Sequence, residues 1–320
     1  MSSLPPVLCF GEALGLVAAQ MTAPGSSSSP ATLTFAGAES NVAIGLARQG
    51  VPVAYFSAVG EDWFGQAIRR SLAAEGVDAG GVRVDRQART GLMIKQPQVL
   101  SEPSVVYYRE DSAFARNAME IAREIPVQAD GVLFVSGITP ALRPDIGRAF
   151  LELLKRAAAG GMRIYFDINF RSRLWTWEQA RGTLCPLLPF CQVVFSSETE
   201  ARSLTGESGD FEKAAAALLR LGAKEVIIKR GPEGASYFSE GSRFDGAAHR
   251  IPFVVDPIGA GDAFDAGFVA GRIKGYDLEK CLALGAILGA AACSFTGDWE
   301  GLPLEPQTRR LLEGDLESAR

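Results

Sequence analysis

The stretch IPFVVDPIGAGDAFDAGFVAGRIK, residues 251–274, decides the fold of this chain. Its apolar run Phe253–Val255 predicts a short buried strand. Asp256-Pro257 would end that strand, because proline has no N–H and restricts the residue before it. Gly259-Ala260-Gly261 predicts a turn with almost no side chains, and the small and apolar residues from Asp262 onward predict a tightly packed helix. The segment therefore predicts a strand, a bare turn and a helix in direct succession.

The predicted helix start is a candidate anion site. Its first N–H groups have no partner within the helix, and the helix dipole adds partial positive charge. The N–H groups of Gly259, Ala260 and Gly261 would stabilise charge on a transferred phosphoryl group, while Asp262 would accept the proton of an attacking alcohol. We expect the dipole to keep Asp262 ionised at neutral pH. The alternative is that Asp262 only satisfies the start of the helix.

Two longer motifs resemble one enzyme family. Residues 254–268, VVDPIGAGDAFDAGF, resemble the C-terminal signature of the ribokinase-like (PfkB) carbohydrate kinases, with Asp262 at the position of the catalytic base. Residues 36–50 and 58–77 resemble the N-terminal signature. The resemblance implies a ribokinase-like α/β fold, in which a mostly parallel central sheet is flanked by helices and carries a small β-sheet lid. It also implies an ATP-dependent sugar kinase.

The chain is long enough for one large domain. It has 320 residues, of which 47% are hydrophobic, so a sizeable core is expected. Predicted strands and helices alternate along its length, which favours a parallel sheet wrapped by helices. We expect a single domain over residues 1–320, with lid segments at about 12–36 and 89–112 implied by the resemblance. Alternating residues from Val82 to Tyr108 predict a small sheet.

Composition excludes several function classes. The net charge is −5 with both signs interspersed, which gives no footprint for nucleic acid. The five cysteines are odd in number and show no C-x-x-C spacing, so zinc and a disulfide framework are not expected. No stretch reads as a signal peptide or membrane span, and we expect a cytoplasmic protein with no membrane partner. The single histidine, His249, has no suggested partner and favours a surface or structural role.

The resemblance implies sugar contacts in the N-terminal half. Gly37 and Asn41 would face the sugar, although a backbone turn and a helix-start hydrogen bond explain them equally well. Tyr107, Tyr108 and Arg109 could pack on a sugar backbone and bind an acid group. The alternative is an ordinary strand ending in an exposed arginine.

The nucleotide side is implied by three further segments. A strand over 162–166 leads into Asn169 and Arg171, and ligands bind at such strand ends in open parallel sheets. The implied ATP contacts are Asn169, Arg171, Lys229, Arg230, Gly231, Pro232, Glu233, Gly234, Gly259, Ala260, Gly261 and Asp262. Glu200 occupies the acidic position of the family's Asn-x-x-Glu motif, which helps to organise Mg²⁺ through water. Ser197 replaces the asparagine, and a serine helix cap is the alternative.

Several motifs resemble the 2-keto-3-deoxygluconate kinases of this family. They are GAESNVA, VYYRxxSA, SGITPAL, DxNxRxxLW and GDxEGxP, and they extend the resemblance over nearly the whole chain. They imply phosphorylation of the C6 hydroxyl of a sugar acid, with Asp298 as another sugar contact. Arg109 and Arg171 are candidate clamps for the carboxylate, although they could bind ATP phosphates instead.

The sequence is also compatible with other functions. Within the family they are a fructokinase and a kinase for 2-keto-3-deoxygalactonate. Outside it, the alternative is a non-catalytic sugar- or nucleotide-binding regulator on the same fold. The resemblance also implies a homo-oligomer formed through the lid. The chain has neither a Walker P-loop nor a Gly-x-Gly-x-x-Gly after its first strand.

Overall fold

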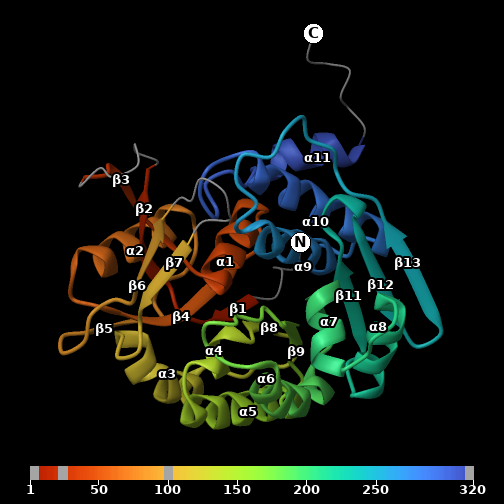
Figure 1. Ribbon diagram of the computed structural model, residues 1–320, viewed down its shortest axis with the longest axis horizontal. Coiled ribbons are helices and arrows are strands. Elements are labelled where there is room, and N and C mark those ends of the chain that lie inside the picture. Colours follow the sequence, from red (N-terminus) through yellow and green to blue (C-terminus); the bar gives the residue numbers. More distant parts are fainter. Residues whose placement is uncertain (1–6, 21–27, 97–103, 314–320) are drawn as a thin grey trace.

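The fold is taken from a computed structural model that describes residues 7–20, 28–96 and 104–313. Within these residues, nine strands form one twisted central sheet in the order β13-β12-β11-β10-β9-β8-β1-β4-β5 (Figure 1). Every pairing is parallel except the two that involve β12. The strands are β1 Val7–Phe10, β4 Val53–Gly60, β5 Val82–Asp85, β8 Val132–Ser136, β9 Arg163–Asp167, β10 Val193–Ser197, β11 Glu225–Lys229, β12 Ala235–Ser239 and β13 Ser242–Gly246.

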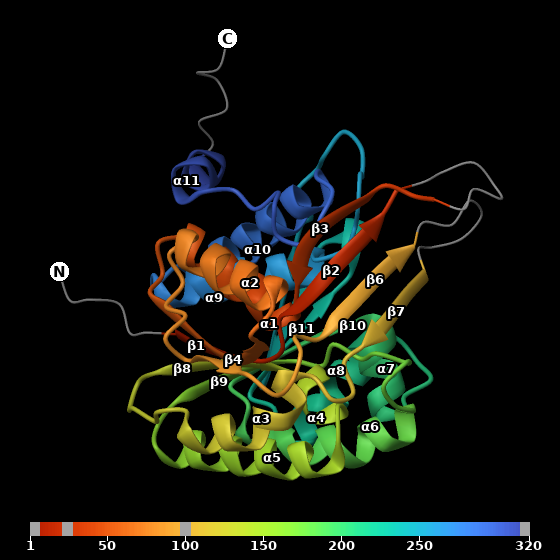
Figure 2. The same ribbon diagram turned by 90° about the vertical axis from the view of Figure 1, so that its left-hand side faces the viewer.

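Helices cover both faces of this sheet (Figure 2). One face carries α1 Ala38–Arg48, α2 Trp63–Ala74, α9 Ala260–Ile273 and α10 Leu278–Cys293. The other carries α3 Ala113–Glu124, α5 Pro144–Ala159, α6 Trp177–Leu184, α7 Glu198–Thr205 and α8 Phe211–Arg220. Alternate residues of a buried strand point to the two faces of the sheet. Val7 and Cys9 of β1 therefore pack in the core on the first face, and Leu8 and Phe10 pack in the core on the other face. The predicted α/β architecture is confirmed.

A second, smaller sheet projects from the body (Figure 2). Its order is β3-β2-β6-β7, with β2 Leu14–Ala19, β3 Ala31–Ala36, β6 Leu92–Gln96 and β7 Ser104–Tyr108. The predicted small sheet is therefore present, and the parts of its segments at 21–27 and 97–103 lie outside the described residues. The expectation that it begins at Val82 is wrong, because β5 pairs with β4 at the edge of the large sheet.

The predicted strand at Phe253–Val255 is also wrong. These residues form no strand, and Phe253, Val254 and Val255 are 70%, 60% and 48% exposed. Their segment instead crosses to the end of α10, where the N–H groups of Val255 and Asp256 donate to the carbonyl of Cys293. Hydrophobicity alone cannot distinguish a buried strand from an apolar surface loop in so short a run.

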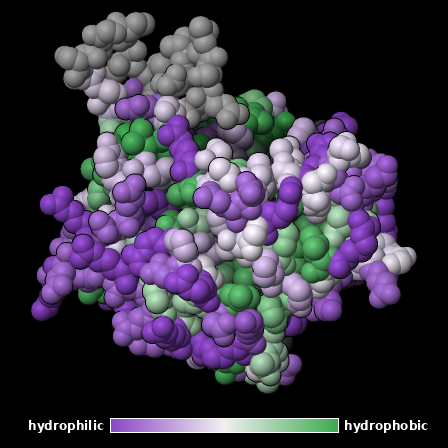
Figure 3. Space-filling model, turned by 60° about the horizontal axis from the view of Figure 1, so that its bottom comes forward, coloured by the Kyte–Doolittle hydropathy of each residue, from purple (hydrophilic) through white to green (hydrophobic). Residues whose placement is uncertain are grey.

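The sheet topology marks one place for a ligand. β1 lies between β4 and β8, and the chain reverses its direction of winding at this point. Open α/β sheets bind ligands beside the carboxyl ends of the strands at such a reversal. Elsewhere the surface has mixed polarity, and Figure 3 shows one face where small hydrophobic patches interrupt hydrophilic side chains. In the part of the chain described, no helix is long and apolar enough to cross a bilayer.

The aromatic centre of the core gives a first prediction. Phe195 is fully buried on β10, and its ring lies 5.6 Å from that of Phe268 on α9 and 6.4 Å from those of Phe134 and Tyr165. Phe195→Ala should lower the free energy of unfolding by about 3–5 kcal/mol, because it removes a large buried ring. Exposed Phe253→Ala is the control and should change it by less than about 0.5 kcal/mol. Urea unfolding measures both; equal losses would contradict this description of the core.

Candidate active site

Helix α9 begins at the carboxyl edge of the sheet with a sharp glycine turn. Gly259 has a φ of +79°, and an added Cβ would collide with the carbonyl oxygen of Asp298. Only glycine combines this backbone conformation with so close a neighbour. The Ala260 N–H donates to the Pro257 carbonyl at 3.3 Å, so this amide is partly used within the turn. The N–H groups of Gly259 and Gly261 donate to no backbone carbonyl among the described residues.

Asp262 lies in the first turn of α9 with both carboxylate oxygens held by amides. Asn41 Nδ2 of α1 donates to Oδ2 at 2.8 Å, and Asn169 Nδ2, just beyond β9, donates to Oδ1 at 3.3 Å. Burial raises the pKa of Asp262, while the Asn41 hydrogen bond and the charge of Arg171 oppose that rise. The expected effect of the helix dipole is therefore countered by desolvation. Three segments far apart in the sequence fix the position of this carboxylate.

Asp262 faces a cavity of about 170 Å³ between the small sheet and the large one. Eight predicted site residues line it: Gly37, Asn41, Tyr107, Arg109, Arg171, Gly259, Asp262 and Asp298. The rest of its lining is Glu12, Leu14, Ala36, Ala38, Glu39, Met93, Lys95, Val105, Ile138 and Ile258. The cavity is smaller than the roughly 300–1,000 Å³ of drug-sized sites. It has room for one small polar substrate but not for a nucleotide as well.

Three cations line the cavity, and they differ in whether an acidic side chain already pairs with them. Arg109 is buried, and its Nη2 lies 2.6 Å from Glu12 Oε2, so its charge is already compensated. Lys95 of the small sheet lies 2.6 Å from Asp256, which precedes the turn at Gly259. Arg171 is exposed and forms no ion pair with any described residue. Arg171 is therefore the cation best able to bind an incoming anion.

Two further acids are buried beside Asp262. Burial raises the pKa of Glu39 to about 7, although a hydrogen bond from Ser136 Oγ at 2.6 Å opposes the rise. Burial also raises the pKa of Asp298 to about 7, and the negative charge of Asp262 adds to the effect. Both side chains line the cavity. Near neutral pH they can therefore donate as well as accept hydrogen bonds.

Other predicted residues lie elsewhere. Tyr108 is 61% exposed and does not line the cavity, because neighbouring residues of a strand point to opposite faces. Lys229 points inward from β11, and its Nζ contacts Asp167 and Asp265 rather than the cavity. The loop at Gly231–Glu233 is an exposed 3₁₀ turn at the end of β11, and Gly234 behind it is buried. Its Arg230 pairs with Glu233 and Asp245.

Glu200 forms a helix cap. Its Oε2 accepts hydrogen bonds from the N–H and hydroxyl of Ser197 at 2.8 Å, and the Ser197 hydroxyl accepts from the Glu200 N–H. Its Oε1 accepts from the Phe170 N–H at 2.7 Å, which anchors the segment that carries Asn169. The part of the chain described contains no group of three or more histidine, cysteine or acidic side chains arranged to hold a metal ion.

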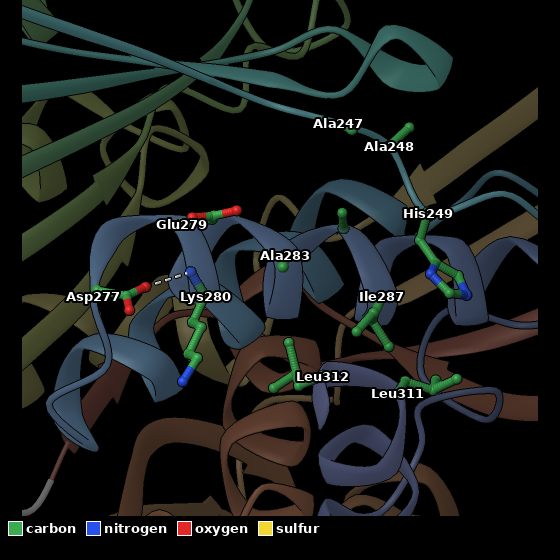
Figure 4. Close-up of a pocket in the computed structure, with 11 residues that line it drawn as sticks. Ala247, Ala248, His249, Asp277, Glu279, Lys280, Ala283, Ile287, Leu311 and Leu312 are labelled. Carbon is green, nitrogen blue, oxygen red and sulfur yellow. Dashed lines mark hydrogen bonds between the residues drawn. The ribbon is translucent and has the colours of Figure 1, made fainter. Parts of the chain in front are cut away.

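A separate cavity of about 380 Å³ lies between α10, helix α11 (Glu305–Glu313) and residues 247–249 (Figure 4). His249, Ile287 and Leu311 line it together with several alanines. It shares no lining residue with the cavity of Asp262 and contains none of the predicted site residues. The single histidine therefore lies outside the candidate active site.

Comparison with known proteins agrees with this geometry. A family model described as pfkB family carbohydrate kinase matches residues 6–304. The chain belongs to this family. It is 35% identical to a 2-dehydro-3-deoxygluconokinase of Bacillus subtilis over 97% of this chain and 95% of the relative. It is 33% identical to a 2-dehydro-3-deoxygalactonokinase of Haloferax volcanii over 88% of each chain.

A solved structure extends the likeness to three dimensions. The crystal structure of a putative Ribokinase II from E. coli, in complex with ATP and Mg²⁺, matches with a TM-score of 0.85 and 26% identity. The match covers 97% of this chain and all of that one. The protein is thus a pfkB sugar kinase of a family that binds ATP, as its sequence motifs predicted.

The sequence prediction did not identify several residues around the pfkB site. Glu39 and Lys95 line the cavity, and Asp265 lies beneath it. Asp265 could have been suspected from its spacing, since residues three apart on a helix are neighbours and Asp262 precedes it by three. No spacing rule connects Lys95 to Asp256, which is 161 residues away.

The buried Glu39 predicts a dependence of stability on pH. The folded protein binds its proton more tightly than an unfolded chain does, with a pKa of about 7 against 4.5. Glu39 therefore contributes stability below pH 4.5 that is lost as pH rises toward 7, at up to about 1.4 kcal/mol per pH unit. Glu39→Gln should flatten the fall of the unfolding free energy across this range, measured by urea unfolding. Parallel curves for variant and wild type would contradict the prediction.

Proposed function

We propose that this protein transfers the γ-phosphoryl group of ATP to the C6 hydroxyl of 2-keto-3-deoxygluconate. The observation that carries the proposal is the placement of Asp262. Its carboxylate is buried at a glycine-lined helix start, held by two amides, and faces a cavity lined by cations and acids. The relative named 2-dehydro-3-deoxygluconokinase supports this choice of substrate.

Asp262 is the proposed general base. Asn41 and Asn169 hold its oxygens in place, and each oxygen retains a lone pair for the proton of the attacking hydroxyl. Phosphoryl transfer has a loose transition state and needs positioning more than a strong base. Burial raises the pKa of Asp262, which makes its carboxylate a stronger proton acceptor.

The turn before α9 is the proposed anion hole. The unpaired N–H groups of Gly259 and Gly261 and the positive end of the helix dipole would stabilise the charge that develops on the phosphoryl group. Ala260 was expected to contribute equally, but its N–H is partly used by the Pro257 carbonyl. Gly259 and Gly261 therefore carry most of this role in our proposal.

Arg171 is the proposed clamp for the substrate carboxylate. It lines the cavity without a competing ion pair among the described residues, whereas the guanidinium of Arg109 is occupied by Glu12. We assign Arg109 to shaping the cavity together with Tyr107. An acidic substrate would pair with the charge of Arg171, whereas a neutral sugar offers this guanidinium no charged partner.

ATP would lie beyond the cavity, along the exposed loop at Gly231–Glu233 and the segment from Asn169 to Arg171. Bound Mg²⁺ would neutralise charge on its phosphates. Both oxygens of Glu200 already accept hydrogen bonds, so the residues described here do not form a direct metal site. Glu200 would therefore contact Mg²⁺ only through water, since Mg²⁺ keeps several of its waters.

The exposed face of the small sheet is the proposed site of self-association. Leu33 on its edge strand is 52% exposed, and Tyr108 lies on the outer face at the opposite edge.

The galacto epimer of the substrate is the main alternative, because the Haloferax volcanii relative is named for it. A coupled assay of ADP release with both epimers and with neutral sugars separates these substrates.

Asp262→Asn tests the proposed base. The amide keeps the shape of the side chain but cannot accept the proton, so kcat should fall about 10²–10⁴-fold with little change in KM. The exposed Glu152→Gln on α5 is the control and should leave kcat unchanged. Near-normal turnover by Asp262→Asn would remove this residue from the mechanism.

Arg171→Ala tests the proposed clamp. The loss of a charged hydrogen bond should lower kcat/KM for the sugar acid about 10–100-fold and affect a neutral sugar much less. Arg173→Ala is the matched control, because Arg173 is exposed two residues away and does not line the cavity. An equal loss for both substrates would assign Arg171 to ATP or to the fold.

A further inference from the structure

Two ion pairs join strand β11 to helix α9, one at each end of their contact. Near the active site, Lys229 Nζ lies 3.0 Å from Asp265 Oδ1. At the far end, Arg272 Nη2 lies 2.8 Å from Glu225 Oε1. Only the first pair is connected to the catalytic cavity. The second pair can therefore serve as a control for the first, because it joins the same strand and helix.

A continuous path of contacts leads from Asp265 to Asp262. Lys229 Nζ also contacts Asp167 Oδ2 at 3.0 Å, and that same oxygen accepts Asn169 Nδ2 at 3.2 Å. Asn169 Nδ2 also reaches Asp262 Oδ1 at 3.3 Å. The side chains of Asp167 and Asp265 are 4% and 0% exposed. Water therefore cannot replace these contacts without rearrangement.

The position of Asn169 needs such support. Its φ is +42°, in the left-handed region that costs most residues other than glycine about 1–3 kcal/mol and costs asparagine less. The carboxylates of Asp167 and Asp262 both accept hydrogen bonds from its side-chain nitrogen Nδ2. Asp167 can do so only while its own charge is balanced, and Lys229 is the cation that contacts it.

We propose that Lys229 and Asp265 are positioning residues for phosphoryl transfer, which fix the Asp262 carboxylate through Asp167 and Asn169. The proposal rests on the proposed role of Asp262 as the base. It replaces the sequence-based expectation that Lys229 contacts ATP. Asp265 serves as the buried counter-ion that holds the ammonium in place.

The hydrogen-bond inventory argues against a phosphate ligand at Lys229. An ammonium has three donors. The structure directs them at Asp167 Oδ2, Asp265 Oδ1 and Asp265 Oδ2, the last at 3.2 Å. A Cβ added to Gly261 would lie 3.3 Å from Nζ, so the charge sits beneath the turn rather than in the cavity. Burial opposes the charge of Lys229, but the two carboxylates more than compensate and raise its pKa.

The test replaces the whole pair rather than one member. A single change such as Lys229→Met leaves buried carboxylates unpaired and should lower the melting temperature. The double variant Lys229→Met/Asp265→Leu removes one of the two unpaired acids but leaves Asp167 without its cation, so it should melt between the single variant and the wild type. Its kcat should nevertheless fall about 10–100-fold, with KM for ATP changed less than about threefold, because the base is no longer held in place.

The control pair is Glu225→Leu/Arg272→Met, in the same strand and helix. It should leave kcat unchanged, since neither residue contacts the path to Asp262. Wild-type kcat in Lys229→Met/Asp265→Leu would reduce the pair to a structural role. A large rise in KM for ATP with unchanged kcat would return Lys229 to nucleotide binding. Loss of activity in Asp262→Asn, measured alongside, separates failure of this proposal from failure of the proposed base.

Discussion

The site depends on burying several carboxyl groups together beside the start of one helix. Asp262 must accept a proton in our proposal, yet its side chain is buried. Isolated buried charges are very costly. The fold meets this constraint with hydrogen bonds from the amides of Asn41 and Asn169 and with the positive charges of Arg171 and Lys229. The topology that brings β1, β9, α1 and α9 to one edge of the sheet is what makes this arrangement possible.

Most helices and strands could be predicted from local patterns in the sequence. The glycine turn, the helix start at Asp262 and the alternation of strands and helices are properties of neighbouring residues, and the sequence predicts them correctly. The run at Phe253–Val255 misled because hydrophobicity reports a preference for burial but not the presence of a strand partner. The same limit applies to Val82–Asp85, whose partner in the large sheet lies more than twenty residues earlier in the chain.

The sequence predicted the region of the fold in which a residue lies more easily than the groups that its side chain contacts. Arg109 was expected to bind an acid group of the substrate; it lines the cavity, but its guanidinium already pairs with Glu12, 97 residues away. Lys229 was expected in the nucleotide loop, but two acids from β9 and α9 draw it inward. Glu200 was placed beside the metal, and the geometry shows a cap that braces the Asn169 segment. Such pairings depend on contacts between distant segments, which spacing in the sequence does not encode.

The contact between Lys95 and Asp256 has a consequence for the order of events in a catalytic cycle. Lys95 belongs to the small sheet, and Asp256 begins the segment that leads into the glycine turn, so the ion pair ties the small sheet to that turn. In the proposed kinase, a movement of the small sheet away from the turn would break this ion pair, which includes no part of the reactants. The rate of product release would then depend partly on the strength of the Lys95–Asp256 ion pair, and product release could be slower than the chemical step.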